Sequence, residues 1–454
     1  MPPDSFLQAL ETHFVPDRVI RDAGALDPYA RDNKVEGVPP LAVVCPQGED
    51  EVVRLVRLCR EHHVPVVPRG AGTGTVGGAV PESRCVAVDL TRMNRVLEIH
   101  PGDMIARVEP GIVTEVFQAE VERTGLFYPP DPASADRCTI GGNVATNAGG
   151  LRAVKYGVTG DWVPALSAVL ADGRVLRTGH RTRKGVVGYD LTHLFVGSEG
   201  TLGIITEITV RLARRPETRR TLIASFADLP SCARGVQAIL AGSVIPSAIE
   251  LVDAECVGAA RTAGHLSDFD GPYLLIEVDG RTNDVMRDIA EIGALMREGG
   301  ATVTTARDEA ESRALWDARR ALSDALRDAA PKKMSEDITV PLSRLVDVLA
   351  GVRELAAPRG LRHVSYGHAG DGNLHVNILY DPTEPCIQER VAAFRSDLFD
   401  LTLRLGGTMS GEHGVGIAKR PFIARELSPQ SLAAHRAIKQ ALDPDGLMNP
   451  GKIW

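Results

Sequence analysis

The chain has 454 residues, with 51 basic and 59 acidic side chains and a net charge of −8. This length exceeds what one hydrophobic core commonly serves, so we expect two domains, or one large and one small domain. The mild acidity argues against nucleic acid as the main partner, because binding a phosphate backbone requires a basic surface.

The cysteine content and the N-terminus indicate the compartment. The seven cysteines are an odd number and include no Cys-x-x-Cys pair, which fits reduced thiols and argues against a disulfide framework or an iron–sulfur cluster within the chain. The first eleven residues lack a basic-then-apolar signal pattern, and no stretch of about 18 apolar residues occurs. We expect a cytoplasmic protein without a transmembrane segment; peripheral membrane contact and a homodimer both stay open.

The first half of the chain is predicted to combine short strands with two helices. An apolar strand at residues 41–44 and another at 64–67 enclose a helix over Glu49–His62, which has a helical apolar period. Further elements are predicted to be strands at residues 85–90, 96–100, 105–109, 165–170 and 204–212, and a helix at 113–124.

The composition changes at residues 214–217, where we place the end of the first domain. Beyond this point we predict strands at residues 221–226, 248–252, 273–278 and 301–305, and helices at 230–241 and 284–298. Strands and helices that alternate at this spacing predict an α/β layer separate from the first half.

Two glycine clusters interrupt the first half, at Arg69–Gly78 and at Gly141–Gly150. Glycine lets backbone N–H groups approach a ligand, and pyrophosphate is the usual one. The first cluster is neither a Walker A loop nor a good dinucleotide fingerprint, because no Gly-Lys-Ser/Thr follows it and strands come next. A single such loop is more often a structural turn. Two of them in one domain predict that one long ligand is held from both sides.

A later segment, His368–His375, has histidines at both ends. Asp371 and Gly372 within it predict a tight turn of the hairpin kind. Alternation after the turn places His375 and Asn377 on the same face of a strand.

A carboxylate and a histidine follow in Ser410–Gly416, where Glu412 and His413 lie between glycines. Such glycines let a backbone pass close to a flat cofactor. Two histidines and one carboxylate form a divalent-metal set. Spacing alone supports two interpretations equally: a metal site, or His368 and His375 as hydrogen-bonded pocket residues.

Several of these segments resemble one family. Pro68–Gly74 is similar to the pyrophosphate loop of the vanillyl-alcohol-oxidase type of FAD domain. The segments that resemble its other FAD-contacting parts are 141–150, 155–157, 197–206 and the closing 442–452. Within this family the chain resembles, over nearly its whole length, the branch of D-lactate, D-2-hydroxyglutarate and glycolate dehydrogenases.

The resemblance implies an α+β fold. It comprises a two-subdomain vanillyl-alcohol-oxidase-type FAD-binding domain over residues 1–213, a ferredoxin-like α/β cap domain over 214–412, and a C-terminal segment, 413–454, that returns to the FAD domain. FAD is expected to be non-covalent, because Thr73 stands where some relatives carry a histidine that bonds to the cofactor. The residues that the resemblance places against FAD are Arg69, Gly70, Ala71, Gly72, Thr73, Gly74, Thr75, Pro132, Ser134, Thr139, Gly142, Asn143, Thr146, Asn147, Gly150, Val158, Glu199, Gly203, Ile204 and Asn449.

The same resemblance assigns the chemistry. His368, His375 and Glu412 match the ligands of a divalent metal, zinc or manganese, and His413 matches the catalytic base. A non-heme iron oxygenase uses the same ligand triad, but the two FAD-type loops count against it because such an enzyme needs no flavin.

Oxidation of a 2-hydroxyacid explains why these residue types are needed. The hydroxyl proton leaves to a neutral histidine, a metal orients and acidifies the hydroxyl, and hydride moves from C2 to flavin N5. Arg319, on a predicted amphipathic helix, is the candidate to bind the substrate carboxylate, and the family has an arginine there. The alternative for Arg319 is a solvated charge like that of Arg320. Asn377 is expected to bind substrate or to support the metal.

The segment Lys332–Pro341 bears on the choice of substrate. Ser335 and Glu336 offer no fixed cation where dicarboxylate-using relatives place basic or polar groups, which favours D-lactate over D-2-hydroxyglutarate; glycolate is a further alternative. An oxygen-using oxidase and a non-catalytic flavoprotein subunit are the competing functions, and the retained histidines and glutamate argue against the subunit. Electrons are expected to leave to an electron-accepting protein or a quinone.

Overall fold

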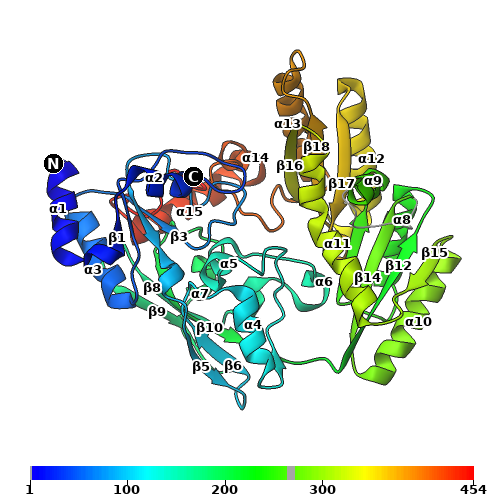
Figure 1. Ribbon diagram of the computed structural model, residues 1–454, viewed down its shortest axis with the longest axis horizontal. Helices are drawn as coiled ribbons and strands as arrows, with labels where there is room; N and C mark the ends of the chain where they lie inside the picture. The colour runs from blue at the N-terminus through cyan, green and yellow to red at the C-terminus, as the bar shows by residue number, and fades with distance from the viewer. Residues whose placement is uncertain (1–2, 263–270) are drawn as a thin grey trace. The chain divides into compact units, whose positions relative to one another are not determined.

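The computed structural model describes residues 3–262 and 271–454 of the chain, which form two compact units (Figure 1). Unit 1 comprises Met1–Gly149, Val158–Arg215 and Glu412–Trp454, and unit 2 comprises Gly150–Gly157 and Pro216–Gly411. None of the described helices combines the length and the apolar character that a membrane span needs.

The first sheet of unit 1 has the strand order β1-β2-β4-β3, in which β2, β4 and β3 are parallel. Its strands are β1 (Val19–Ile20), β2 (Ala42–Val44), β3 (Val66–Arg69) and β4 (Val86–Asp89). Helix α3 (Glu49–Glu61) connects β2 to β3, as predicted, and buries Val52 and Leu55. Helix α1 (Pro3–His13) adds Phe6 and Leu10 to the same core.

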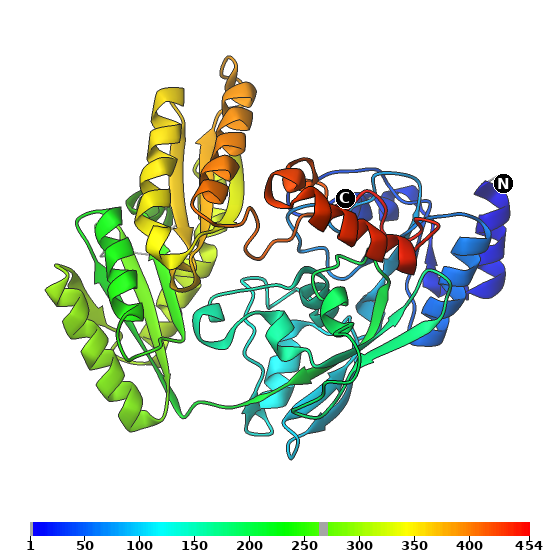
Figure 2. The same ribbon diagram turned by 180° about the vertical axis from the view of Figure 1, so that it is seen from behind.

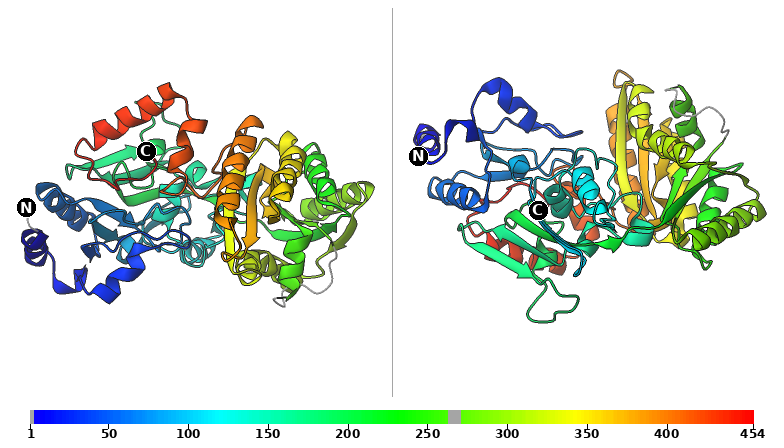
Figure 3. Two further views of the ribbon diagram at one scale, coloured as in Figure 1. Left: turned by 90° about the horizontal axis from the view of Figure 1, so that it is seen from above. Right: turned by 60° about the horizontal axis from the view of Figure 1, so that its bottom comes forward.

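The second sheet of unit 1 is antiparallel, with the order β5-β6-β10-β8-β9. Its strands are β5 (Val96–His100), β6 (Ile105–Val108), β8 (Ala165–Val169), β9 (Val175–Gly179) and β10 (Ile204–Arg211). Helix α4 (Thr114–Glu122) buries Phe117 in its core, and Ile438 and Leu442 of the C-terminal α15 (Pro429–Leu442) pack against that core. Figure 3 shows α15 in red beside the strands of this unit.

The remaining short elements of unit 1 fill the connections. They are α2 (Ala23–Leu26), α5 (Ile140–Thr146), α7 (Thr192–Phe195), α14 (Ile423–Glu426) and the paired strands β7 (Leu126–Phe127) and β11 (Ala213–Arg214). Helix α5 corrects one expectation, because the second glycine cluster was predicted as a loop. Thr139 caps this helix by accepting from Gly142 N at 3.2 Å, and Ile140 and Val144 bury its apolar side.

Unit 2 begins with the ferredoxin-like arrangement that the resemblance implied. Its elements are β12 (Thr218–Ser225), α8 (Leu229–Leu240), β13 (Ala248–Val252), α9 (Ala254–Thr262), β14 (Tyr273–Gly280), α10 (Thr282–Glu298) and β15 (Thr302–Thr305). The antiparallel order β15-β12-β14-β13 is that of a β-α-β-β-α-β fold.

A second, incomplete copy of this arrangement extends the same sheet. It consists of β16 (Lys332–Thr339), α12 (Leu345–Ala356), β17 (Arg362–Gly367), β18 (Asn373–Tyr380) and α13 (Ile387–Arg404). These strands continue the order as β13-β17-β18-β16. After α13, the place of a fourth strand is reduced to the antiparallel bridge Thr339↔Thr408. No repeat is visible in the sequence, so this duplication exists at the level of topology.

The two faces of this sheet are covered differently. Figure 2 shows α10, α8, α12 and α13 side by side as one layer. The opposite face is covered by α9 and by α11 (Glu309–Asp328), whose Trp316 and Leu322 share a core with Val364 and Tyr366 of β17. The candidate site residues of unit 2 described below lie on the face that α9 and α11 cover.

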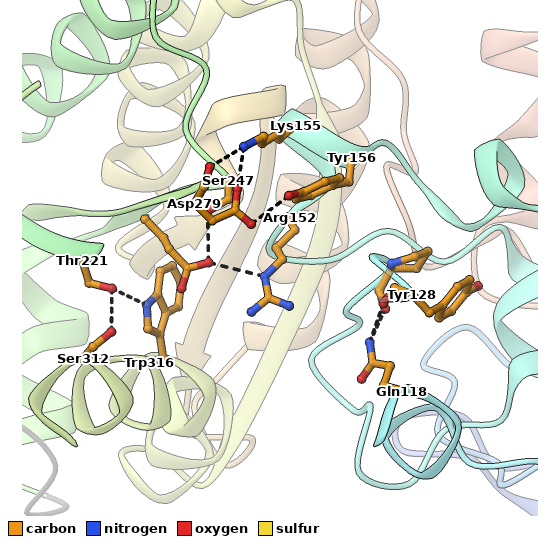
Figure 4. A network of polar contacts seen from close by, with 12 residues as sticks. Gln118, Tyr128, Arg152, Lys155, Tyr156, Thr221, Ser247, Asp279, Ser312 and Trp316 are labelled. Atoms are coloured by element: carbon orange, nitrogen blue, oxygen red, sulfur yellow. Dashed lines mark hydrogen bonds and ion pairs between the residues drawn. The ribbon is translucent and has the colours of Figure 1, made fainter. Parts of the chain in front are cut away.

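The segment Gly150–Gly157, with the short helix α6 (Ala153–Tyr156), joins unit 2 through side chains (Figure 4). Lys155 Nζ donates to Asp279 Oδ1 at 2.5 Å and to Asp279 O at 2.8 Å. Arg152 Nε contacts Glu277 Oε1 at 3.4 Å. Both acids lie on β14, so this short segment is fixed to the sheet although its neighbours in sequence belong to unit 1.

Candidate functional site

A row of polar side chains crosses the face of the unit 2 sheet that α9 and α11 cover. His375 and Asn377 lie on β18, on one face of the strand as predicted. Tyr366 of β17 is paired with His375 on one side, and Asp337 of β16 is paired with it on the other. Adjacent strands therefore place an aromatic ring, an imidazole and a carboxylate at one level of the sheet.

His368 follows β17 at the start of the predicted turn, which Gly372 ends with φ of 81°. The rings of His368 and His375 have centroids 5.4 Å apart and planes at 86°. Each offers a ring nitrogen within 4.8 Å of the other. His368 Nδ1 lies 2.6 Å from Glu250 Oε1. A carboxylate on one ring nitrogen is the arrangement that orients a histidine and raises the basicity of its other nitrogen toward a metal.

Glu250 is fully buried in β13 and joins the histidine to an arginine. Its Oε2 accepts from Arg319 Nε at 2.7 Å and also contacts Arg319 Nη2. The Arg319 guanidinium lies 4.7 Å from the centroid of the Tyr366 ring. Burial alone raises the pKa of Glu250, but Arg319 and His368 together hold it below its usual value. Glu250 is therefore an ionised acceptor between two cation-capable partners.

These contacts define how the predicted substrate residues are placed. Arg319 lies on α11 and is 4% exposed, with its Nε–Nη2 edge engaged by Glu250. A carboxylate ligand would therefore meet the end of the guanidinium, where Nη1 lies. Asn377 is fully buried, and its Nδ2 donates to His375 O at 3.0 Å. Its Oδ1 is buried without a hydrogen-bond partner among the described residues, which fits a bound group that donates a proton.

Unit 1 contains the glycine cluster predicted to bind pyrophosphate. The Arg69 guanidinium is buried and donates to the carbonyls of Pro28 at 3.1 Å, Arg31 at 2.9 Å and Ala79 at 3.3 Å. It thus holds the loop in place through backbone acceptors. Thr75 Oγ1 in this cluster is buried and has no hydrogen-bond partner within the described ranges. An orphaned hydroxyl inside a glycine-rich loop fits a ligand with acceptor oxygens, such as a pyrophosphate.

The side chains of the second glycine cluster are engaged within the protein. Asn143 Nδ2 donates to Thr114 Oγ1 at 2.8 Å, Thr146 Oγ1 donates to Gly142 O at 3.1 Å, and Asn147 Oδ1 accepts from Gly160 N at 2.8 Å. The other residues that the resemblance places against FAD divide between the units: Gly150 belongs to unit 2, whereas Pro132, Ser134, Val158, Gly203 and Ile204 belong to unit 1.

Glu199 and Asn449 bring distant segments of unit 1 together. Asn449 Nδ2 donates to Gly78 O at 2.7 Å and to Glu199 O at 2.6 Å. The Glu199 carboxylate accepts from Val415 N at 2.6 Å and from Gly416 N at 2.9 Å. The end of the chain and the segment after His413 are thereby fixed to the first glycine cluster.

Glu412 and His413 begin the part of the chain that returns to unit 1. Glu412 lies beside Gly149, where an added Cβ would be 2.9 Å from Glu412 Oε2. His413 Nε2 is 3.7 Å from Glu412 Oε1. The two side chains are thus neighbours in unit 1, while His368 and His375 are neighbours in unit 2.

Glu250 and Asp337 were not anticipated as site residues. A signal for both was present, because each carboxylate sits in a strand whose neighbours are buried. A buried acid needs a cation or several N–H donors, so Ala248–Val252 with its single glutamate predicts a partner elsewhere in the fold.

Comparison with known proteins identifies the two parts. A family model described as "FAD linked oxidases, C-terminal domain" matches residues 215–453, and one described as "FAD binding domain" matches residues 40–179. The glycolate oxidase subunit GlcD of Bacillus subtilis is 42% identical, with 91% of this chain and 89% of that protein covered. The D-lactate dehydrogenase of Anaerostipes hadrus is 36% identical, with 91% and 89% covered.

Solved structures show the same fold at low sequence identity. p-Cresol methylhydroxylase superposes with a TM-score of 0.84 at 20% identity, covering 99% of this chain and 96% of that one. The 4-ethylphenol oxidase from Gulosibacter chungangensis gives 0.80 at 20% identity, with 99% and 97% covered. The expected vanillyl-alcohol-oxidase-type fold is confirmed.

Proposed function

The chain belongs to the FAD-linked oxidase family, and from this premise we propose that it oxidises a small D-2-hydroxyacid to the 2-oxoacid with non-covalent FAD and a divalent metal. D-lactate is the first candidate substrate. Glycolate is the second, because the relative at 42% identity is named a glycolate oxidase subunit. The observation that carries the proposal is the His368–His375 pair with Glu250 on Nδ1 of His368, which is a donor set suited to a metal.

Each residue has a proposed role. His368, His375 and Glu412 would hold zinc or manganese, and His413 would accept the hydroxyl proton of the substrate. Arg319 would bind the substrate carboxylate through the end of its guanidinium, and Asn377 would bind the substrate or support the metal. A metal held by these residues would polarise the hydroxyl, and bound FAD would supply a hydride acceptor at N5.

Anaerobic reduction of the flavin tests this function. The FAD-loaded protein is mixed with D-lactate, glycolate, D-2-hydroxyglutarate or L-lactate, and loss of flavin absorbance is followed by stopped flow. We expect bleaching with D-lactate or glycolate and none with L-lactate. Bleaching with D-2-hydroxyglutarate alone would reject D-lactate and glycolate as the substrates, and no bleaching by any of the hydroxyacids would reject the function.

Substitution of the proposed base separates binding from chemistry. His413→Ala should retain FAD and lose bleaching, with a rate constant lower by about 10²-fold or more. The matched control is His435→Ala, a histidine exposed on α15 of the same unit, which should bleach at the wild-type rate. Bleaching of His413→Ala at the wild-type rate would contradict the assignment.

Metal dependence and the electron acceptor need their own measurements. Metal content by mass spectrometry should fall in His375→Ala. In protein depleted of metal, added Zn²⁺ or Mn²⁺ should restore bleaching only where both His368 and His375 are present. We propose that electrons leave to a protein or a quinone. Slow reoxidation of the reduced flavin in air fits this dehydrogenase function, whereas rapid reoxidation would identify an oxidase.

A further inference from the structure

We propose that two buried carboxylates, Asp337 in unit 2 and Glu199 in unit 1, anchor the backbone on either side of Glu412-His413-Gly414 and thereby position the acid and the imidazole within it. This inference rests on the proposed function, in which Glu412 and His413 act on metal and substrate. It concerns positioning residues, because neither carboxylate is assigned a contact with substrate.

The unit 2 end of the segment is anchored along β16. Thr408 N donates to Thr339 O at 2.9 Å, and Thr339 N donates to Thr408 O at 3.1 Å. Asp337, two residues earlier on β16 and 1% exposed, accepts from Gly411 N at 3.0 Å and from Ser410 Oγ at 3.3 Å through Oδ2. The backbone that leads to Glu412 is therefore fixed to the strand that pairs with the one carrying His375.

The other oxygen of Asp337 is also engaged, which fixes the orientation of the carboxylate. Its Oδ1 accepts from Asn373 Nδ2 at 2.5 Å, and the same amide nitrogen lies 3.1 Å from Ile338 O. Asn373 is the first residue of β18. The anchor thus lies on the pair of strands, β16 and β18, that also carries His375.

The unit 1 end is anchored by Glu199, which is 5% exposed. Its carboxylate accepts from Val415 N at 2.6 Å and from Gly416 N at 2.9 Å. Glu199 itself has φ of 51°, a left-handed conformation that the surrounding contacts must maintain. Asn449 contributes by donating to the Glu199 carbonyl at 2.6 Å.

Between the anchored amides of Gly411 and Val415 lie the three residues Glu412, His413 and Gly414. The glycines of this segment would make an unanchored chain flexible. Here they make close approaches, because an added Cβ at Gly411 would lie 2.1 Å from Asn373 Nδ2 and one at Gly414 would lie 2.8 Å from Glu199 Oε1. Each anchor restricts the backbone within its own unit next to Glu412 or His413, and restricting the backbone is one condition for holding a catalytic group in one geometry.

The first measurement uses the FAD-loaded wild-type protein and amide-resolved hydrogen exchange. The amides of Gly411, Val415 and Gly416 lie outside the helices and strands, yet they should be protected because each donates to a buried carboxylate. Rapid exchange of these three amides in the wild-type protein would by itself overturn the inference.

The variants Asp337→Asn and Glu199→Gln then weaken one end each, because both oxygens of each carboxylate accept hydrogen bonds and the NH₂ group that replaces one oxygen cannot accept. Asp337→Asn should raise exchange about tenfold or more at Gly411 and leave Gly416 unchanged, and Glu199→Gln should do the reverse. Both should lower the rate constant of flavin reduction by about 10²-fold, with the half-saturating substrate concentration changed by less than about threefold. FAD content should stay at the wild-type level in Asp337→Asn.

Glu109→Gln is the matched control, since Glu109 is also a buried carboxylate of unit 1 that accepts a backbone N–H, from Arg95 at 2.9 Å. Its flavin reduction should stay within about twofold of wild type even if its stability falls. The inference is overturned if the two anchor variants reduce flavin as this control does, or if exchange changes equally at both ends. A wild-type reduction rate in His413→Ala would reject the proposed base, whereas the exchange pattern judges the anchors independently.

Discussion

The two units hold their candidate binding groups in place in different ways. In unit 1 the candidate ligand-binding parts are backbone loops, where Arg69 binds the carbonyls of Pro28 and Arg31 and Glu199 binds N–H groups of the glycine-containing segment after His413. In unit 2 the candidate groups are side chains on strands, on helix α11 and in the turn after β17, where His368 contacts Glu250 of β13. Unit 1 should therefore be sensitive to an added Cβ, and unit 2 to a lost charge or hydrogen bond.

The largest effect is expected from removing one partner of the buried ion pair in unit 2. Arg319→Met leaves the fully buried Glu250 without its cation, so the free energy of unfolding should fall by about 3–5 kcal/mol. The midpoint of urea unfolding, followed by circular dichroism, measures this loss. The double variant Arg319→Met/Glu250→Gln should regain part of it, because no buried charge is left unpaired.

Arg320→Met is the control for the same helix. Arg320 is exposed, and its ion pair with Asp317 has a separation of 3.7 Å, so its loss should cost less than about 1 kcal/mol. Equal midpoints for Arg319→Met and Arg320→Met would contradict the importance of side-chain charge in unit 2.

The corresponding test in unit 1 adds a methyl group. In Gly416→Ala the new Cβ would lie 2.2 Å from Val76 O at a residue with φ of 50°, so the backbone must shift where Glu199 and the first glycine cluster meet. We expect the free energy of unfolding to fall by about 2–4 kcal/mol and FAD to be lost on desalting.

Gly446→Ala separates overlap from conformational strain. Gly446 has φ of 64° and nothing within 4 Å of an added Cβ, so Gly446→Ala should cost about 1–2 kcal/mol and retain FAD. If both alanine variants behaved alike, the close backbone contact would not be what unit 1 depends on.

Much of this contrast could be predicted from the sequence, and the reasons for the failures are physical. The apolar periods placed α3 and β18 correctly because one face of each is buried. The helix α5 was missed because glycine disfavours helices locally, whereas the Thr139 cap and the buried Ile140 and Val144 stabilise it through tertiary contacts.

The closeness of His368 and His375 was predictable because residue types are themselves diagnostic there. Histidines on either side of an Asp-Gly turn indicated a polar cluster before any fold was known. Glu250 and Asp337 were not predicted because their partners are far away in the sequence. Glu250 of β13 binds Arg319 of α11, and Asp337 of β16 binds Gly411, which follows α13. Pairings of this kind depend on strand order, which local pattern does not determine.

A pH titration sharpens the account of Glu199. Burial raises its pKa from 4.5 to about 7, although Val415 and Gly416 N–H groups and the lysines Lys452 and Lys419 favour the charged form. Between these two values the unfolded chain ionises at this position while the folded protein stays protonated. The folded state then binds more protons, so stability should fall as pH rises from about 4.5 to about 7, by about 3 kcal/mol in total.

The variant Glu199→Gln isolates this contribution. The difference in unfolding free energy between wild type and Glu199→Gln should decline across that pH window and become constant above about pH 7. Urea unfolding at half-unit pH steps measures it. A difference that is flat, or that increases with pH, would show that this carboxylate is ionised throughout.

A smaller loss than that of Arg319→Met is expected where the side-chain contacts of unit 2 hold a segment that follows the second glycine cluster. Lys155 is 27% exposed, and its partner Asp279 is fully buried and also accepts from Tyr156 OH at 2.8 Å. Lys155→Met removes a charged hydrogen bond but leaves that of Tyr156, so the free energy of unfolding should fall by about 2 kcal/mol. Lys184→Met, at an exposed position, is the control and should be neutral. Because the ammonium group of Lys155 is bound to β14, FAD affinity measured by flavin fluorescence should change less than about threefold. Loss of FAD from Lys155→Met would instead mean that the segment Gly150–Gly157 contacts the cofactor directly. Side-chain contacts like those of unit 2 would then contribute to FAD binding, beside the backbone loops of unit 1.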